Sequence, residues 1–172
     1  MGNRKGQAAL EFMMTYGWAI LVVLAAIGAL SYFGVLNPSR FTPDTCLASV
    51  PFSCPGKPLI SLTTNNVVFS FVNGEGFSVA LSSVAPSMTL SQPLLDAGCT
   101  VPATLCPQGN VSCPDSTSVT LQPGQGMTVV IPCANAALVK TNVVKGDVSF
   151  TYTNPDSRLT ESVLISVTGK PK

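Results

Sequence analysis

The sequence predicts a long hydrophobic α-helix at the N-terminus, followed by an all-β, antiparallel β-sandwich-like domain that disulfide bonds hold together. Three observations lead to this prediction. Residues 12–36 form 25 consecutive positions without a charge. The rest of the chain contains short segments in which apolar and polar residues alternate, and all six cysteines lie after the apolar run. We expect the helix to cover residues 7–37 and the β-domain to cover residues 38–172.

The apolar run is long enough to cross a membrane. At about 1.5 Å per residue it forms a helix of roughly 37 Å, which spans a bilayer core with some tilt. The alternative is a secretory signal peptide, whose apolar region is shorter and precedes a cleavage site of small residues; no such site follows this run. Arg4 and Lys5 precede the run and only Arg40 follows it closely. The positive-inside rule therefore favours a cytoplasmic N-terminus and an exported β-domain.

Glu11 is the only charged residue between Lys5 and Arg40. A carboxylate in hydrocarbon costs a few kcal/mol, and less near the end of a helix than at its centre. Two interpretations follow. Either Glu11 lies at the level of the lipid headgroups and is solvated there, or it marks the position of a partner.

The segment KGQAALEF, residues 5–12, resembles the class III signal peptide of archaeal type IV pilins and related pilin-like surface proteins. The resemblance implies that a prepilin peptidase cuts between Gly6 and Gln7 and removes the leader, residues 1–6, while the apolar helix stays on the mature protein. Glu11 then becomes the fifth residue of the mature chain, where type IV pilins carry their characteristic glutamate, and Phe12 follows it. The sequence departs from the archaeal pattern at Ala9, where that pattern often has a serine.

The resemblance also implies a role for Glu11 in assembly. Cleavage creates a new α-amine at Gln7, which would pair with Glu11 of a neighbouring subunit; pairing within one subunit is a competing arrangement. Between subunits, the pair would neutralise two charges that neither chain could bury alone, and would favour one axial register. The implied partners are further copies of the chain in a helical filament, the prepilin peptidase, the pilus assembly machinery and the membrane.

Period-two alternation predicts eight strands in the β-domain: residues 59–62, 67–72, 77–84, 88–90, 119–121, 127–131, 147–153 and 162–168. Residues 154–157 (Asn-Pro-Asp-Ser) form a strong turn signal, so the last two strands should form a C-terminal hairpin. Residues 73–76 (Asn-Gly-Glu-Gly) are also expected to be a hairpin turn. Short strands at this spacing are typical of a β-sandwich.

An even number of cysteines in an exported domain indicates disulfide bonds. A zinc site is a poorer alternative, because the chain has no C-x-x-C pair and no histidine. Fifteen pairings are open; a bond between Cys46 and Cys54 would close a short loop, and the other four would attach the strand-poor segment 96–114 to the sandwich. The candidates are Cys46, Cys54, Cys99, Cys106, Cys113 and Cys133. Asn110 begins the sequon Asn-Val-Ser, a candidate for N-glycosylation.

Composition argues against several other functions. Histidine is absent, which removes Ser-His-Asp and Cys-His nucleophile pairs and histidine-ligated metals. The acidic residues of the β-domain fall mostly in turns, where they cap the backbone. We therefore expect no enzyme, no cofactor and no metal. Basic residues after the apolar run are scattered, which gives no footprint for nucleic acid: Arg40, Lys57, Lys140, Lys145, Arg158, Lys170 and Lys172.

Two functions are expected from these features. The first is a structural subunit of an archaeal type IV pilus-like filament, anchored in the membrane before assembly and displaying its β-domain at the cell surface for adhesion. The alternative is a single-pass, membrane-anchored pilin-like receptor or minor pilin, whose exported β-domain binds a ligand or partner. Replacement of Glu11 distinguishes them, since only the filament depends on that carboxylate.

Overall fold

The computed structural model describes residues 4–36, 42–110, 113, 116–134 and 143–172. The chain divides into two compact units, Met1–Phe41 and Thr42–Lys172. The first consists of helix α1 and the turn that follows it. The second contains the strands, a short helix and all six cysteines. An N-terminal apolar helix followed by a disulfide-bonded antiparallel β-domain is the fold class that the sequence predicts.

Helix α1 (Arg4–Tyr32) ends earlier than residue 37, the predicted end. Gly34 has a φ of +70°, a left-handed conformation that glycine adopts without strain. Its N–H donates to the Ser31 carbonyl at 3.0 Å, and the Val35 N–H donates to the Leu30 carbonyl at 3.1 Å. These two bonds satisfy carbonyl groups at the end of the helix in a Schellman motif. The glycine therefore ends the helix five residues before the predicted end at residue 37.

The described strands of the β-domain form two four-stranded sheets and one two-stranded sheet, and all strand pairs are antiparallel. The first sheet has the order β1 (Thr45–Ala48), β10 (Thr160–Gly169), β9 (Val144–Thr153), β5 (Met88–Leu90). The second has the order β2 (Leu59–Ser61), β3 (Asn66–Val72), β8 (Gly126–Pro132), β6 (Thr104–Pro107). Strands β4 (Val79–Ser82) and β7 (Ser118–Leu121) pair with each other, and α2 (Gln92–Asp96) follows β5.

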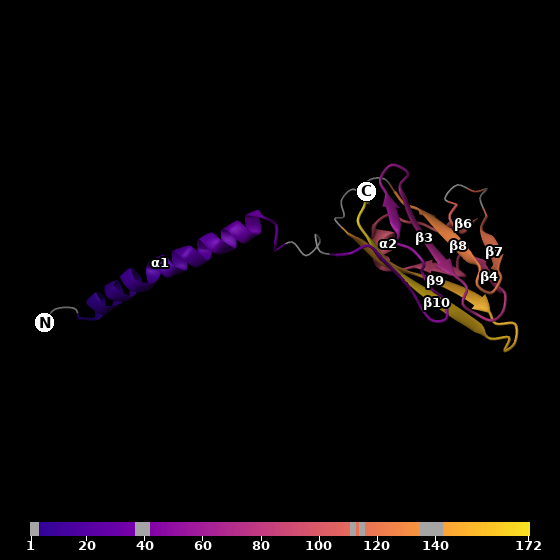
Figure 1. The fold of residues 1–172 in the computed structure, drawn as a ribbon, viewed down its shortest axis with the longest axis horizontal. Coiled ribbons are helices and arrows are strands. Elements are labelled where there is room, and N and C mark those ends of the chain that lie inside the picture. Colours follow the sequence, from indigo (N-terminus) through magenta and orange to yellow (C-terminus); the bar gives the residue numbers. More distant parts are fainter. Residues whose placement is uncertain (1–3, 37–41, 111–112, 114–115, 135–142) are drawn as a thin grey trace. The chain divides into compact units, whose positions relative to one another are not determined.

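The predicted C-terminal hairpin is confirmed. Strands β9 and β10 pair along their whole length, with Phe150 opposite Val163 and Val148 opposite Ile165; Figure 1 shows them as two long neighbouring strands. Their alternate apolar side chains are buried, so one face of the hairpin belongs to the core. The turn is closed by Asn154, whose Oδ1 accepts a hydrogen bond from the Asp156 N–H at 2.9 Å.

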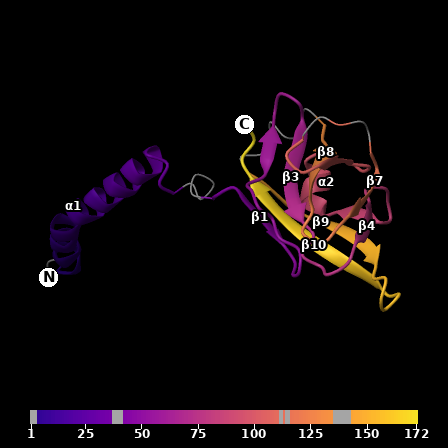
Figure 2. The same ribbon diagram turned by 45° about the vertical axis from the view of Figure 1, so that its right-hand side comes forward.

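The core lies between the two four-stranded sheets, which Figure 2 shows from a second direction. Phe71 of β3 contacts Phe150 of β9, with ring centroids 5.8 Å apart. Phe52 packs edge-on against both Phe71 and Tyr152, at 6.1 and 5.7 Å. Such pairs add to the stabilisation that comes from removing the rings from water.

All eight predicted strands are present, with ends that differ from the prediction by at most three residues. Strands β1 and β6 and helix α2 were not predicted. The segment 96–114 was expected to be strand-poor, and its described residues contain one short strand, β6. Both missed strands are short edge strands, and neither sequence has the alternation of apolar and polar residues from which the other strands were predicted.

The expected hairpin turn at residues 73–76 is also wrong. Strands β3 and β4 do not pair with each other, so this segment connects two different sheets. Asn73 is fully buried and donates from Nδ2 to the carbonyls of Phe77 and Leu121, at 3.0 and 3.1 Å. The residues predict a turn correctly, but turn chemistry does not determine which strands the turn joins.

Candidate functional site

Helix α1 presents the largest apolar surface of the described chain. The most apolar 18 residues of its segment Ala9–Tyr32 have a mean hydropathy of 2.0, and none of that stretch is buried. Phe12, Trp18 and Leu24 are each more than 60% exposed. It is the one helix among the described residues that is long and apolar enough to cross a membrane. A surface of this kind has to be covered by lipid or by protein.

The apolar surface surrounds the helix rather than following one stripe. Gly17 and Gly28 interrupt the large side chains, and an added Cβ at either position would meet no atom within 4 Å. Small residues of this kind let another helix approach closely. The helix can therefore contact lipid or other helices on every side.

Glu11 lies in the N-terminal part of α1 and is exposed. Its backbone carbonyl accepts a hydrogen bond from Thr15 Oγ1 at 2.8 Å. Phe12 stacks against Tyr16 one turn further along, with ring centroids 4.6 Å apart. Within the described residues no ion pair involves the Glu11 carboxylate. Among the described residues, the Glu11 carboxylate is thus exposed and has no ion-pair partner.

The residues of the expected cleavage site lie in the first turns of α1. Arg4, Lys5, Gly6 and Gln7 are all helical, and their side chains lie outside the described part of the structure. The cut between Gly6 and Gln7 and the pairing of a new α-amine with Glu11 remain predictions.

The six cysteines form three disulfide bonds: Cys46–Cys54, Cys99–Cys133 and Cys106–Cys113. The first is the short-loop pair that the sequence favoured. No cysteine remains free to hold zinc.

The other two disulfides have different roles. Cys99–Cys133 attaches the segment after α2 to the end of β8, as expected. Cys106–Cys113 does not attach the segment 96–114 to the sandwich, because both cysteines lie inside it. It closes a loop instead, and Cys106 packs with Val68 and Val130 on the outer side of the second sheet.

Asn110 lies in the loop that Cys106–Cys113 closes, and it is exposed. Its N–H donates to the Pro107 carbonyl at 3.1 Å. The other two residues of the sequon, 111 and 112, lie outside the described residues. Glycosylation of Asn110 remains a prediction.

Two acidic residues that the sequence does not link meet at Tyr152. The Tyr152 hydroxyl lies 2.9 Å from Glu75 Oε1 and 2.9 Å from Glu161 Oε2. Asn154 Nδ2 donates to the other oxygen of Glu161 at 2.8 Å. Burial, together with these hydrogen bonds to Glu161 and Glu75, raises the pKa of Tyr152 well above its ordinary value. The phenol therefore stays protonated, and its single O–H lies between the two acidic side chains as a shared donor.

Sequence reasoning missed this cluster because it depends on strand pairing. Glu161 lies directly opposite Tyr152 in the β9–β10 register, whereas Glu75 comes from the connection between β3 and β4. Only the opposition of Glu161 and Tyr152 could have been found, by aligning the two arms of the predicted hairpin about its turn.

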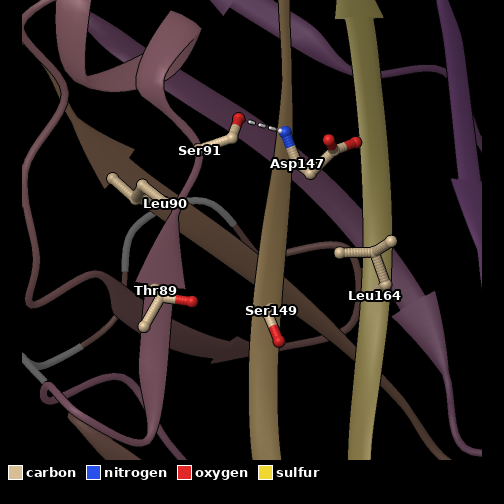
Figure 3. Close-up of a pocket in the computed structure, with 6 residues that line it drawn as sticks. All are labelled: Thr89, Leu90, Ser91, Asp147, Ser149 and Leu164. Atoms are coloured by element: carbon tan, nitrogen blue, oxygen red, sulfur yellow. Dashed lines mark hydrogen bonds between the residues drawn. The ribbon is translucent and has the colours of Figure 1, made fainter.

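A hollow of about 260 Å³ lies on the first sheet. Figure 3 shows the six residues that line it: Thr89, Leu90, Ser91, Asp147, Ser149 and Leu164. The Asp147 N–H donates to Ser91 Oγ at 2.7 Å, and the Asp147 carboxylate accepts a hydrogen bond from Ser166 Oγ. The lining contains one carboxylate and three hydroxyl groups beside apolar surface.

No protein-family model matches this chain, and no curated protein matches it. The class of protein is therefore inferred from structural features alone. An apolar helix long enough to cross a membrane precedes a β-domain with three disulfide bonds. Disulfide bonds are typical of proteins outside the reducing cytosol. These features are compatible with a membrane-anchored protein whose β-domain lies at the cell surface.

Proposed function

We propose that the chain is a structural subunit of an archaeal type IV pilus-like filament, processed between Gly6 and Gln7, with a β-domain displayed for adhesion. One observation carries the proposal. Helix α1 exposes apolar side chains on every side over more than six turns, and its single carboxylate in that stretch, Glu11, lies near the N-terminal end. A helix of this composition is suited both to a bilayer and to the core of a helical filament.

The proposal assigns α1 two successive environments. Lipid covers the helix before assembly, and the helices of neighbouring subunits replace the lipid in the filament. Gly17 and Gly28 would let neighbouring backbones approach. The α-amine of Gln7 and the carboxylate of a neighbouring Glu11 would neutralise each other in this apolar surrounding. The compact β-domain, with its own core, remains outside.

The test is the N-terminal sequence and intact mass of the native protein, taken from membranes and from material sheared off the cell surface. A chain that starts at Gln7 in the sheared fraction is expected. Reduction should add about six mass units, because each of the three disulfides takes up two hydrogens. A chain that starts at Met1 and occurs only in membranes would refute the filament.

A second function, a membrane-anchored receptor or minor pilin, is favoured by the hollow on the first sheet. The variant Glu11→Ala separates the two. A filament subunit should disappear from the sheared fraction while its membrane content is unchanged; a receptor should keep both surface display and ligand binding. Thr15→Ala is the matched control, because it removes a polar side chain one turn away and leaves the carboxylate in place.

A further inference from the structure

The hollow lies where two rows of residues cross strands β5, β9 and β10. Thr89, Ser149 and Leu164 lie opposite one another in the strand registers and form the first row. Ser91 and Asp147, joined by the hydrogen bond drawn in Figure 3, form the second. Residues two apart on a strand point to the same face and are about 7 Å apart. The side chains of Asp147 and Ser149 are therefore presented together.

Several polar groups in the hollow have capacity for further hydrogen bonds. The hydroxyls of Thr89 and Ser149 make no hydrogen bond to other described residues. The Ser91 hydroxyl accepts from the Asp147 N–H, so its own O–H remains a donor. One Asp147 carboxylate oxygen accepts from Ser166, and the other is open. A ligand would meet one strong acceptor and three hydroxyls that both donate and accept.

The lining excludes several ligand classes. Among the residues that the structure describes, no basic side chain lines the hollow to bind an anion such as phosphate. A single carboxylate is few for a divalent cation, which prefers six or more oxygen ligands with several charges. Leu164 is 48% exposed and provides an apolar surface beside the hydroxyls, whereas the Leu90 side chain packs against the core. The volume of about 260 Å³ lies just below the range of about 300 to 1,000 Å³ for drug-sized ligands.

A neutral sugar ring matches these features, since it carries hydroxyl donors and acceptors at its edge and apolar C–H groups on its face. We propose that the hollow formed by Thr89, Ser91, Asp147, Ser149 and Leu164 is a binding site for a single neutral saccharide unit. This inference deepens the proposed function by naming what an adhesive β-domain would attach to. It rests on that function only for surface display; binding itself depends on the folded β-domain.

The test uses the full chain in a detergent without a sugar headgroup, titrated with a panel of neutral hexoses and N-acetylhexosamines and followed by saturation-transfer NMR. The wild type should bind at least one of them with a Kd of about 1 mM. Ser149→Val fills the centre of the hollow and should weaken binding at least tenfold. Asp147→Asn keeps the size but removes the charge of the acceptor, and should weaken binding about tenfold.

Ser162→Val is the matched control, because Ser162 is exposed on the same face of β10 but does not line the hollow. It should bind sugar like the wild type. Circular dichroism establishes that each variant is folded. The inference is overturned if no sugar in the panel binds saturably, or if Ser149→Val binds as well as Ser162→Val. Sugar binding by a chain that is never cut at Gly6 would refute the filament and leave this site standing.

Discussion

Tyr152 joins two parts of the β-domain that are far apart in sequence. Its hydroxyl lies within hydrogen-bond distance of Glu75, in the connection between the sheets, and of Glu161 on the neighbouring strand. A hydrogen bond to a charged group contributes about 1.5–3 kcal/mol, and less where solvent competes. We expect Tyr152→Phe to lower the free energy of unfolding by about 1–2 kcal/mol, as measured by urea unfolding followed by circular dichroism. Unchanged stability would contradict a structural role for the hydroxyl.

The raised pKa of Tyr152 gives this contribution a defined pH dependence. In the unfolded chain the phenol loses its proton near pH 10, whereas the folded protein holds it to higher pH. The stabilisation is therefore fully present below about pH 10 and is lost as pH rises further toward the folded-state pKa. Unfolding at pH 8 and at pH 11 should show a larger loss of stability for the wild type than for Tyr152→Phe. A spectrophotometric titration should show one tyrosine that ionises late, and Tyr152→Phe should lack it.

Gly74 and Gly76 offer a matched pair of substitutions in the connection between β3 and β4. A Cβ at Gly74 would overlap the backbone carbonyl oxygen of Pro51, whereas a Cβ at Gly76 would meet nothing within 4 Å. Gly74→Ala should therefore lower the free energy of unfolding by about 2 kcal/mol, typical of overpacking. Gly76→Ala should stay within about 0.5 kcal/mol of the wild type. If both variants lost the same stability in urea unfolding, the close approach to Pro51 would not be what excludes a side chain at position 74.

Predictability from sequence differs between the elements. The β9–β10 hairpin could be predicted because two alternating strands flank a strong turn, so local sequence and pairing agree. Strands β1 and β6 could not, since neither four-residue sequence alternates apolar and polar residues. The end of α1 was predictable in principle from Gly34, a C-terminal capping residue. The Tyr152 cluster and the hollow require several strands in register, which a single sequence does not specify.

The disulfides differ in the length of chain that they close. Cys99–Cys133 spans 34 residues and Cys106–Cys113 spans 7, so the first removes more conformational freedom from the unfolded chain. Replacing Cys99 and Cys133 with alanine should cost about 3–4 kcal/mol, and replacing Cys106 and Cys113 about 1 kcal/mol less. Each pair contains a cysteine that is almost fully buried, so both double variants should lose a similar amount of packing. Urea unfolding of both double variants checks the order, and the reverse order would show that chain entropy does not dominate.

Across the whole chain, the apolar helix and the β-domain differ in whether they cover their own apolar side chains. Helix α1 satisfies its backbone internally and leaves its side chains for an external cover. The β-domain both pairs its backbone groups and covers its apolar side chains by itself. Its sheets enclose a core, and its C-terminal residues bond to the edge of β2. Lys172 donates from its N–H to the Ile60 carbonyl at 2.9 Å and accepts from the Leu62 N–H at 2.8 Å. Its Nζ pairs with Asp44 at 2.9 Å, close to the start of the domain.

This division predicts that residues 42–172 fold without the helix. Every residue of the main core cluster belongs to this unit. Expressed in an oxidising compartment, the fragment should be a soluble monomer with the same three disulfides, as checked by sedimentation and by peptide mapping without reduction. Its free energy of unfolding should match that of the β-domain in the full chain within about 1 kcal/mol. Aggregation or scrambled disulfides would show that the β-domain depends on residues before 42. The N-terminal segment would then have a role in folding the β-domain, in addition to anchoring and helix packing.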